Sequence, residues 1–207
     1  MPKVKVPRKS TAIDMTAMCD VAFLLLTFFI LTATARQPEP LPVDTPASTV
    51  KFKLPDLDIA TITIGQGKVF FGVKGQKVRE LTLEKMGKIY NIQFTPEEKY
   101  RFSVMESFGV PIGNLKQIIH MSGDERNKQG LQGGIPVDSI GNRASELSDW
   151  VLQARYATKE LNNKDMRVSI KGDAREEYPT VKKVIDILQR QNVNKFSLIT
   201  SLRDEEK

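Results

Sequence analysis

The chain has 207 residues, room for one domain of ordinary size plus an anchor or tail. Its net charge of +6 comes from 31 basic and 25 acidic side chains, and four of the basic ones lie within the first ten residues, so the excess is local and does not indicate a nucleic-acid surface. A single cysteine, Cys19, excludes an intrachain disulfide, and a single histidine, His120, excludes a histidine-cluster metal site and weakens any triad with a histidine base. His120 follows an apolar run, "LKQII", and is interpreted as structural rather than catalytic.

The first predicted element is an apolar helix over residues 13–35, "IDMTAMCDVAFLLLTFFILTATA". At 1.5 Å per residue, 23 residues reach about 35 Å, which is enough to cross a hydrocarbon core of about 30 Å. The basic tail, residues 1–12, precedes this segment. The positive-inside rule therefore predicts a cytoplasmic N-terminus and export of everything after residue 35.

A cleaved signal peptide is the alternative to an uncleaved anchor, because "ATA" at 33–35 fits the small-residue cleavage pattern. Two features count against cleavage. The basic region before the apolar run would be about twenty residues long and would contain Asp14 and Asp20, and the apolar run stays aliphatic and aromatic up to Leu31. We therefore expect an uncleaved anchor.

Asp20 is the unusual residue of this segment, because an aspartate at the middle of a membrane helix costs about 2.5–3.5 kcal/mol. Thr16 stands four residues before it, and Thr27 and Thr34 follow at seven and fourteen residues. At 100° per residue these side chains fall on or near one helix face. The segment thus carries a narrow polar stripe in an otherwise apolar surface.

Two interpretations of the stripe remain open. In the first, Asp20 reaches back to the membrane interface and the threonines bond their own backbone carbonyls. In the second, the stripe faces partner helices and Asp20 takes up and releases protons in a low-dielectric pore, driven by a membrane potential worth about 2.3 kcal/mol per charge per 100 mV. The second interpretation requires partner helices, because one helix cannot shelter an acid alone.

The segment resembles the transmembrane signature of the ExbD/TolR family. The matching positions are Ile13, Asp14, Thr16, Asp20, Val21, Leu24 to Leu26, Phe28, Phe29 and Thr32. Ala17 stands where proline is usual, and Cys19 where an aliphatic residue is usual. The resemblance implies a single-pass bacterial inner-membrane protein with a periplasmic C-terminal domain, in which Asp20 is the proton carrier and Thr16, Thr27 and Thr34 line or orient its path.

The same resemblance implies partners. We expect a dimer of this chain within a pentamer of a multi-pass ExbB/TolQ-like protein, and a TonB-like transducer or peptidoglycan as the periplasmic partner. Such a complex couples the proton motive force to transport across the outer membrane or to work on the envelope. No enzymatic activity, cofactor, metal or nucleic acid is expected. The alternative is an anchored or secreted periplasmic binding domain with no role in transport.

The next segment, residues 36–49, holds four of the eleven prolines and is predicted to be an extended linker. The periplasmic domain is expected over residues 50–207. Within it, residues 50–57 resemble the first family strand, with Leu54 and Pro55, and the C-terminal stretch 166–201 resembles the family's strand, turn, helix and strand. We expect partner contacts at Leu54, Pro55, Asp173 and Tyr178.

The domain's own patterns predict a hairpin of "TITI" and "KVFFGV", then helices at 81–92, 96–108 and 111–121, with Thr95 as N-cap and Pro96 at the first helical position. A glycine-rich mobile loop is expected at 123–142. Because family members pass almost directly from the hairpin to the next helix, residues 81–144 are interpreted as an insertion.

The last predicted elements are a helix from Ala144, a strand at 166–172, a helix at 179–192 and a strand at 195–201. A strand, helix, strand order favours a parallel or mixed sheet with helices on one face. The fold class predicted is therefore a single N-terminal transmembrane helix plus an α+β domain. Two main helices lie on a four- or five-stranded sheet, and the insertion adds further helices.

Overall fold

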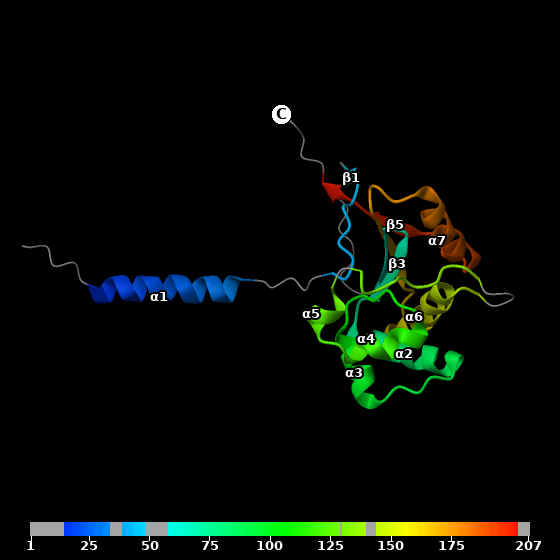
Figure 1. Ribbon diagram of the computed structural model, residues 1–207, viewed down its shortest axis with the longest axis horizontal. Coiled ribbons are helices and arrows are strands. Elements are labelled where there is room, and N and C mark those ends of the chain that lie inside the picture. The colour runs from blue at the N-terminus through cyan, green and yellow to red at the C-terminus, as the bar shows by residue number, and fades with distance from the viewer. Residues whose placement is uncertain (1–14, 34–38, 49–57, 129, 140–143, 203–207) are drawn as a thin grey trace, which may run out of the picture. The chain divides into compact units, whose positions relative to one another are not determined.

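The computed structural model describes residues 15–33, 39–48, 58–128, 130–139 and 144–202. The chain divides into two compact units, Met1–Gln37 and Pro38–Lys207. The described part of the first unit is dominated by helix α1, Met15–Thr32, which has no buried residue (Figure 1). Among the described residues, α1 is the one helix long and apolar enough to cross a membrane, judged by length and a mean hydropathy of 2.0.

The second unit is built on a four-stranded sheet with the order β3-β2-β4-β5. The strands are β2 (Ile59–Gly65), β3 (Lys68–Val73), β4 (Arg167–Gly172) and β5 (Phe196–Ile199). β2 and β3 form an antiparallel hairpin whose two turn residues, Gln66 and Gly67, both have positive φ, as a type I′ turn requires. β4 and β5 add in parallel. Beyond them, β1 (Ala47–Ser48) pairs in parallel with β6 (Ser201–Leu202), so in Figure 1 β1 lies beside the red C-terminal strand.

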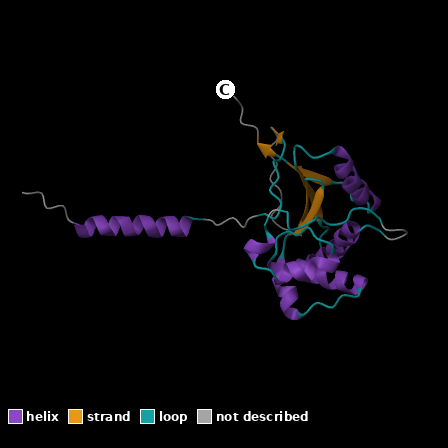
Figure 2. Cartoon of the chain, in the orientation of Figure 1, coloured by secondary structure: helices purple, strands orange, loops and turns teal. Residues whose placement is uncertain are grey.

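One face of the sheet carries the core. Successive strand residues point to opposite faces, and the core residues alternate along β2, β3 and β4. Helices α2 (Gln76–Tyr90), α6 (Glu146–Asn162) and α7 (Tyr178–Arg190) add their apolar stripes to this core; Figure 2 shows the helices and strands together. The core side chains of these strands are Ala60, Ile62, Ile64, Val69, Phe71, Val73, Val168 and Ile170.

Three short helices lie between α2 and α6: α3 (Pro96–Val104), α4 (Ile112–His120) and α5 (Gly123–Arg126). α4 joins the same core through aliphatic side chains such as Leu115 and Ile119, and α3 and the loop after it join through rings that contact Trp150 of α6. The ring centroid of Trp150 lies 6.0 Å from that of Phe102, 4.7 Å from that of Phe108 and 6.5 Å from that of Phe71. The helical insertion is therefore packed into the domain.

The insertion also covers the outer edge of β3. Phe71 and Phe108 exchange two backbone hydrogen bonds, of 2.8 and 3.0 Å, and the Ile135 amide donates to the Val69 carbonyl at 2.8 Å. An unpaired edge strand would expose a row of backbone donors and acceptors. Here loop segments pair with that row.

The predicted fold class is confirmed: an N-terminal apolar helix is followed by an α+β domain with a four-stranded sheet and extra helices. The predicted helix 96–108 is wrong at its end, because the chain becomes extended at Met105 and Phe108 pairs with β3. The predicted helix 81–92 begins earlier, at Gln76. The predicted loop 123–142 contains α5 and two buried residues, Gln132 and Ile135, while residues 129 and 140–143 lie outside the described part.

The predicted start of α3 is confirmed in detail. The Thr95 amide donates to Glu98 Oε2 at 2.8 Å, and the Glu98 amide donates to Thr95 Oγ1 at 3.2 Å, which completes a capping box with Pro96 in the first turn. His120 Nε2 lies 3.1 Å from Glu98 Oε1, and Lys116 Nζ lies 3.8 Å from Oε2. His120 thus contacts a carboxylate that links α3 to α4.

Glu98 gives the domain a testable acid sensitivity. The hydrogen bond from the Thr95 amide lowers the pKa of Glu98 below its usual value; burial opposes this, and His120 and Lys116 add to the lowering. A carboxyl with a depressed pKa stabilises the fold above its unfolded pKa of about 4.3, and this contribution is lost as the pH falls through the folded value. We expect the difference in unfolding free energy between wild type and Glu98→Gln to be constant above about pH 5 and to shrink below about pH 4. Urea unfolding between pH 7 and pH 3 measures it, and an equal difference at both ends would contradict it.

Candidate functional site

The first candidate site is the polar stripe of α1. Asp20 is the one charged residue of this 18-residue helix. Its carboxylate is exposed, and no described residue gives it a side-chain hydrogen bond or an ion pair. The helix surface around it is formed by large exposed apolar side chains such as Phe23 and Leu24. Such a surface is stable only when lipid or other helices cover it.

The unbroken helix places Thr16, Asp20 and Thr27 on one side, since they are four and seven residues apart. The Thr27 hydroxyl donates to the Leu24 carbonyl at 2.9 Å, a local bond that satisfies its proton within the helix. Its oxygen keeps a free lone pair on the stripe. Thr34, the fourth member of the predicted stripe, lies outside the described residues.

The predicted partner contacts of the domain divide into two groups. Asp173 and Tyr178 flank the turn between β4 and α7. The Asp173 carboxylate accepts the Arg175 amide at 2.9 Å, and the Asp173 amide donates to the Ile64 carbonyl, so Asp173 shapes this turn. Tyr178 is 71% exposed and is accessible to a partner. Leu54 and Pro55 lie outside the described residues.

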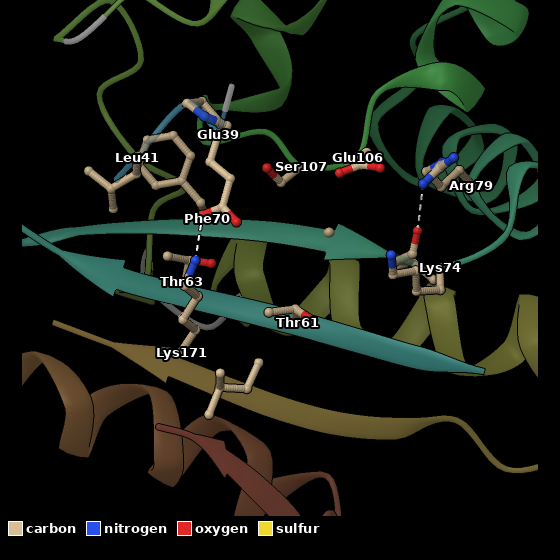
Figure 3. Close-up of a pocket in the computed structure, with 14 residues that line it drawn as sticks. Glu39, Leu41, Thr61, Thr63, Phe70, Lys74, Arg79, Glu106, Ser107 and Lys171 are labelled. Carbon is tan, nitrogen blue, oxygen red and sulfur yellow. Dashed lines mark hydrogen bonds and ion pairs between the residues drawn. The ribbon is translucent and has the colours of Figure 1, made fainter. Parts of the chain in front are cut away.

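A pocket that the sequence did not predict lies on the face of the sheet opposite the core (Figure 3). Its volume is about 300 Å³. Thr61 and Thr63 of β2 and the bare backbone of Gly72 in β3 form its floor. A Cβ on Gly72 would lie 2.4 Å from the Glu106 carbonyl oxygen, so glycine allows the 105–107 loop to approach.

Charged side chains stand at both ends of this pocket. At one end, Lys171 of β4 forms an ion pair with Glu39. At the other end, Arg79 of α2 donates to the Ser103 carbonyl at 2.7 Å and to the Val73 carbonyl at 2.9 Å, which ties the end of α3 to the hairpin. Burial lowers the pKa of the Arg79 guanidinium, and the nearby Glu106 carboxylate opposes this.

The segment Glu39–Ser48 of the predicted linker contacts this side of the domain. Leu41 is buried, and its side chain approaches Gly65 together with Val43. The Ala174 amide donates to the Asp44 carbonyl at 2.8 Å. Three residues that the sequence predicted as linker, Glu39, Pro40 and Leu41, therefore contribute part of the pocket wall. Among the described residues, no group of three or more His, Cys, Asp or Glu side chains is placed to hold a metal ion.

The sequence of the chain matches the model of one known protein family. The family model described as "Biopolymer transport protein ExbD/TolR" matches residues 7–203, nearly the whole chain. No curated protein and no solved structure matched the chain.

Proposed function

Because the chain belongs to the ExbD/TolR family of energy-transducing subunits driven by the proton motive force, we propose that Asp20 is the proton carrier of such a complex. The observation that carries the proposal is the single charged residue of α1 in a helix otherwise suited to the bilayer. An intramembrane acid is costly, and it is retained where it serves an ion or proton path.

The proposal requires partner helices around α1. The apolar side chains of this helix cannot shelter the Asp20 carboxylate by themselves. We propose that a multi-pass ExbB/TolQ-like protein, expected as a pentamer, encloses two copies of α1 and supplies that cover. Thr16, Thr27 and Thr34 then line or orient the proton path, since a hydroxyl can both donate and accept a hydrogen bond.

The basic N-terminal tail favours a cytoplasmic N-terminus and a periplasmic domain. Proton movement at Asp20 drives movement of α1, and the chain beyond residue 35 transmits the work to the domain. A TonB-like transducer or peptidoglycan is the proposed partner there, with Tyr178 as an accessible contact. Asp173 keeps the turn before α7 in shape.

The proposal is tested by reaction with dicyclohexylcarbodiimide, which forms a stable adduct with a protonated carboxyl in apolar surroundings. Membranes that contain the chain and its multi-pass partner are treated at pH 6 and pH 8, and the adduct is located by mass spectrometry of peptides. We expect modification at Asp20, faster at the lower pH, because the reagent attacks the protonated acid.

Glu97 is the internal control, because it is an exposed carboxylate of α3 that is paired with Arg101 and lies in water, not in apolar surroundings. It should remain unmodified in the same sample. Modification of Glu97 to the same extent as Asp20, or no adduct at Asp20, would contradict the proposal.

A further inference from the structure

The sheet-face pocket is a second place where the chain can bind a partner, independent of the proton path. From its charges and shape we infer that it binds the carboxylate of an extended acidic peptide segment from a partner protein. The volume of about 300 Å³ is at the lower end of the range for ligand pockets, about 300–1,000 Å³, and suits a short stretch of chain.

The charges of the pocket favour an anion. Three cations, Lys74, Arg79 and Lys171, line it, against two carboxylates, Glu39 and Glu106. One positive charge is therefore left over. Lys171 is neutralised by Glu39, so the excess lies at the end where Lys74 and Arg79 stand, as Figure 3 shows.

Lys74 is the side chain free to bind. It is exposed, and no described residue gives it an ion pair or a side-chain hydrogen bond. Arg79 already donates to two backbone carbonyls and supplies positive potential from a fixed position. The Glu106 carboxylate already offsets the charge of the Arg79 guanidinium, so the Lys74 ammonium is the cation at this end that gains from an added carboxylate.

The chain itself shows which chemistry the pocket accepts. At its other end the Glu39 carboxylate binds Lys171 while Pro40 and Leu41 line the same wall. In this segment one carboxylate is followed directly by two apolar side chains. The remaining floor is similar, with Thr61 and Gly72 below and the apolar side chains of Phe70 and Ile199 at its border. A peptide lying on it meets the same combination of a cation and apolar surface.

The experiment uses the full-length protein in detergent micelles and a blocked, fluorescein-labelled peptide, Ala-Val-Glu-Val-Ala, whose binding is followed by fluorescence anisotropy. We expect saturable binding that weakens with added salt, because salt screens exposed charges. Lys74→Gln should weaken binding about fivefold, the value of one partly exposed charge pair. The glutamine peptide Ala-Val-Gln-Val-Ala should bind wild type as weakly.

Lys77→Gln is the matched control, because Lys77 is an exposed lysine of α2 that does not line the pocket. Its affinity for the peptide should equal that of wild type. Equal binding of the two peptides, equal binding by Lys74→Gln and wild type, or no saturable binding to wild type would each overturn the inference. The Asp20→Asn protein should bind the peptide normally, so failure here and failure of the proton-carrier proposal remain distinguishable.

Discussion

Replacement of Asp20 by asparagine is expected to abolish energy-dependent uptake while the protein still assembles in the membrane. Asparagine has nearly the size of aspartate but cannot carry a proton at physiological pH. It also removes a charge from the apolar segment, which lowers the insertion cost of about 2.5–3.5 kcal/mol and favours assembly. The measurement is a complementation assay in a deletion strain that also expresses the multi-pass partner. Uptake is followed, and co-purification with the partner reports assembly.

Two further variants make the result specific. Asp20→Glu keeps a titratable carboxyl one methylene further from the backbone and should retain part of the uptake. Thr27→Val removes a hydroxyl whose proton is already bonded to the Leu24 carbonyl and should have a smaller effect than Asp20→Asn. If Asp20→Asn assembles and supports full uptake, Asp20 is an anchor residue that reaches the interface. The chain would then support uptake through the binding properties of its domain and not through a proton path at Asp20.

The elements predicted best were the helices whose apolar residues recur at helical spacing in the local sequence. The apolar run from Met15 to Thr32 is a helix with Asp20 on it, as predicted. In the helix predicted from Ala144, now α6, Leu147, Trp150, Val151 and Ala154 recur at helical spacing, and all four are buried. Helical spacing of apolar residues predicts burial directly, because it requires no knowledge of the partner element.

Elements decided by contacts distant in sequence were predicted less well. The sequence "PEEKYRFSVMESF" continues a helical pattern to Phe108, yet α3 ends at Val104. Phe108 leaves the helix because it pairs with Phe71 and packs on Trp150, contacts that local spacing does not contain. Tertiary packing here overrides helix propensity.

The pocket was missed for the same reason. Alternation in β4 puts Ser169 and Lys171 on the face opposite Val168 and Ile170, and this was a usable signal for a polar sheet face. The ion-pair partner of Lys171, however, is Glu39, which lies 132 residues earlier in a segment predicted as linker. Only the fold brings the two together.

Trp150→Ala is expected to be the most destabilising single substitution in the domain. The Trp150 side chain is fully buried and contacts rings from the sheet, from α3 and from the loop that follows α3. Removing a buried tryptophan typically costs about 3–5 kcal/mol, because the apolar area is lost and the cavity collapses only partly. Urea unfolding of the full-length protein in micelles, followed by circular dichroism, measures the loss without relying on tryptophan fluorescence.

Trp150→Phe and Tyr156→Ala separate packing from other effects. The phenylalanine keeps an aromatic ring but loses the hydrogen bond from Nε1 to Glu146 Oε1, so about 1–2 kcal/mol should be lost. Tyr156 is an exposed residue of the same helix, and its truncation should change stability by no more than about 0.5 kcal/mol. A loss near 4 kcal/mol for Trp150→Ala would mean that the insertion belongs to the core, because Phe102 and Phe108 supply two of the three ring contacts. A loss below about 1 kcal/mol would mean that the insertion can separate from the sheet without unfolding it.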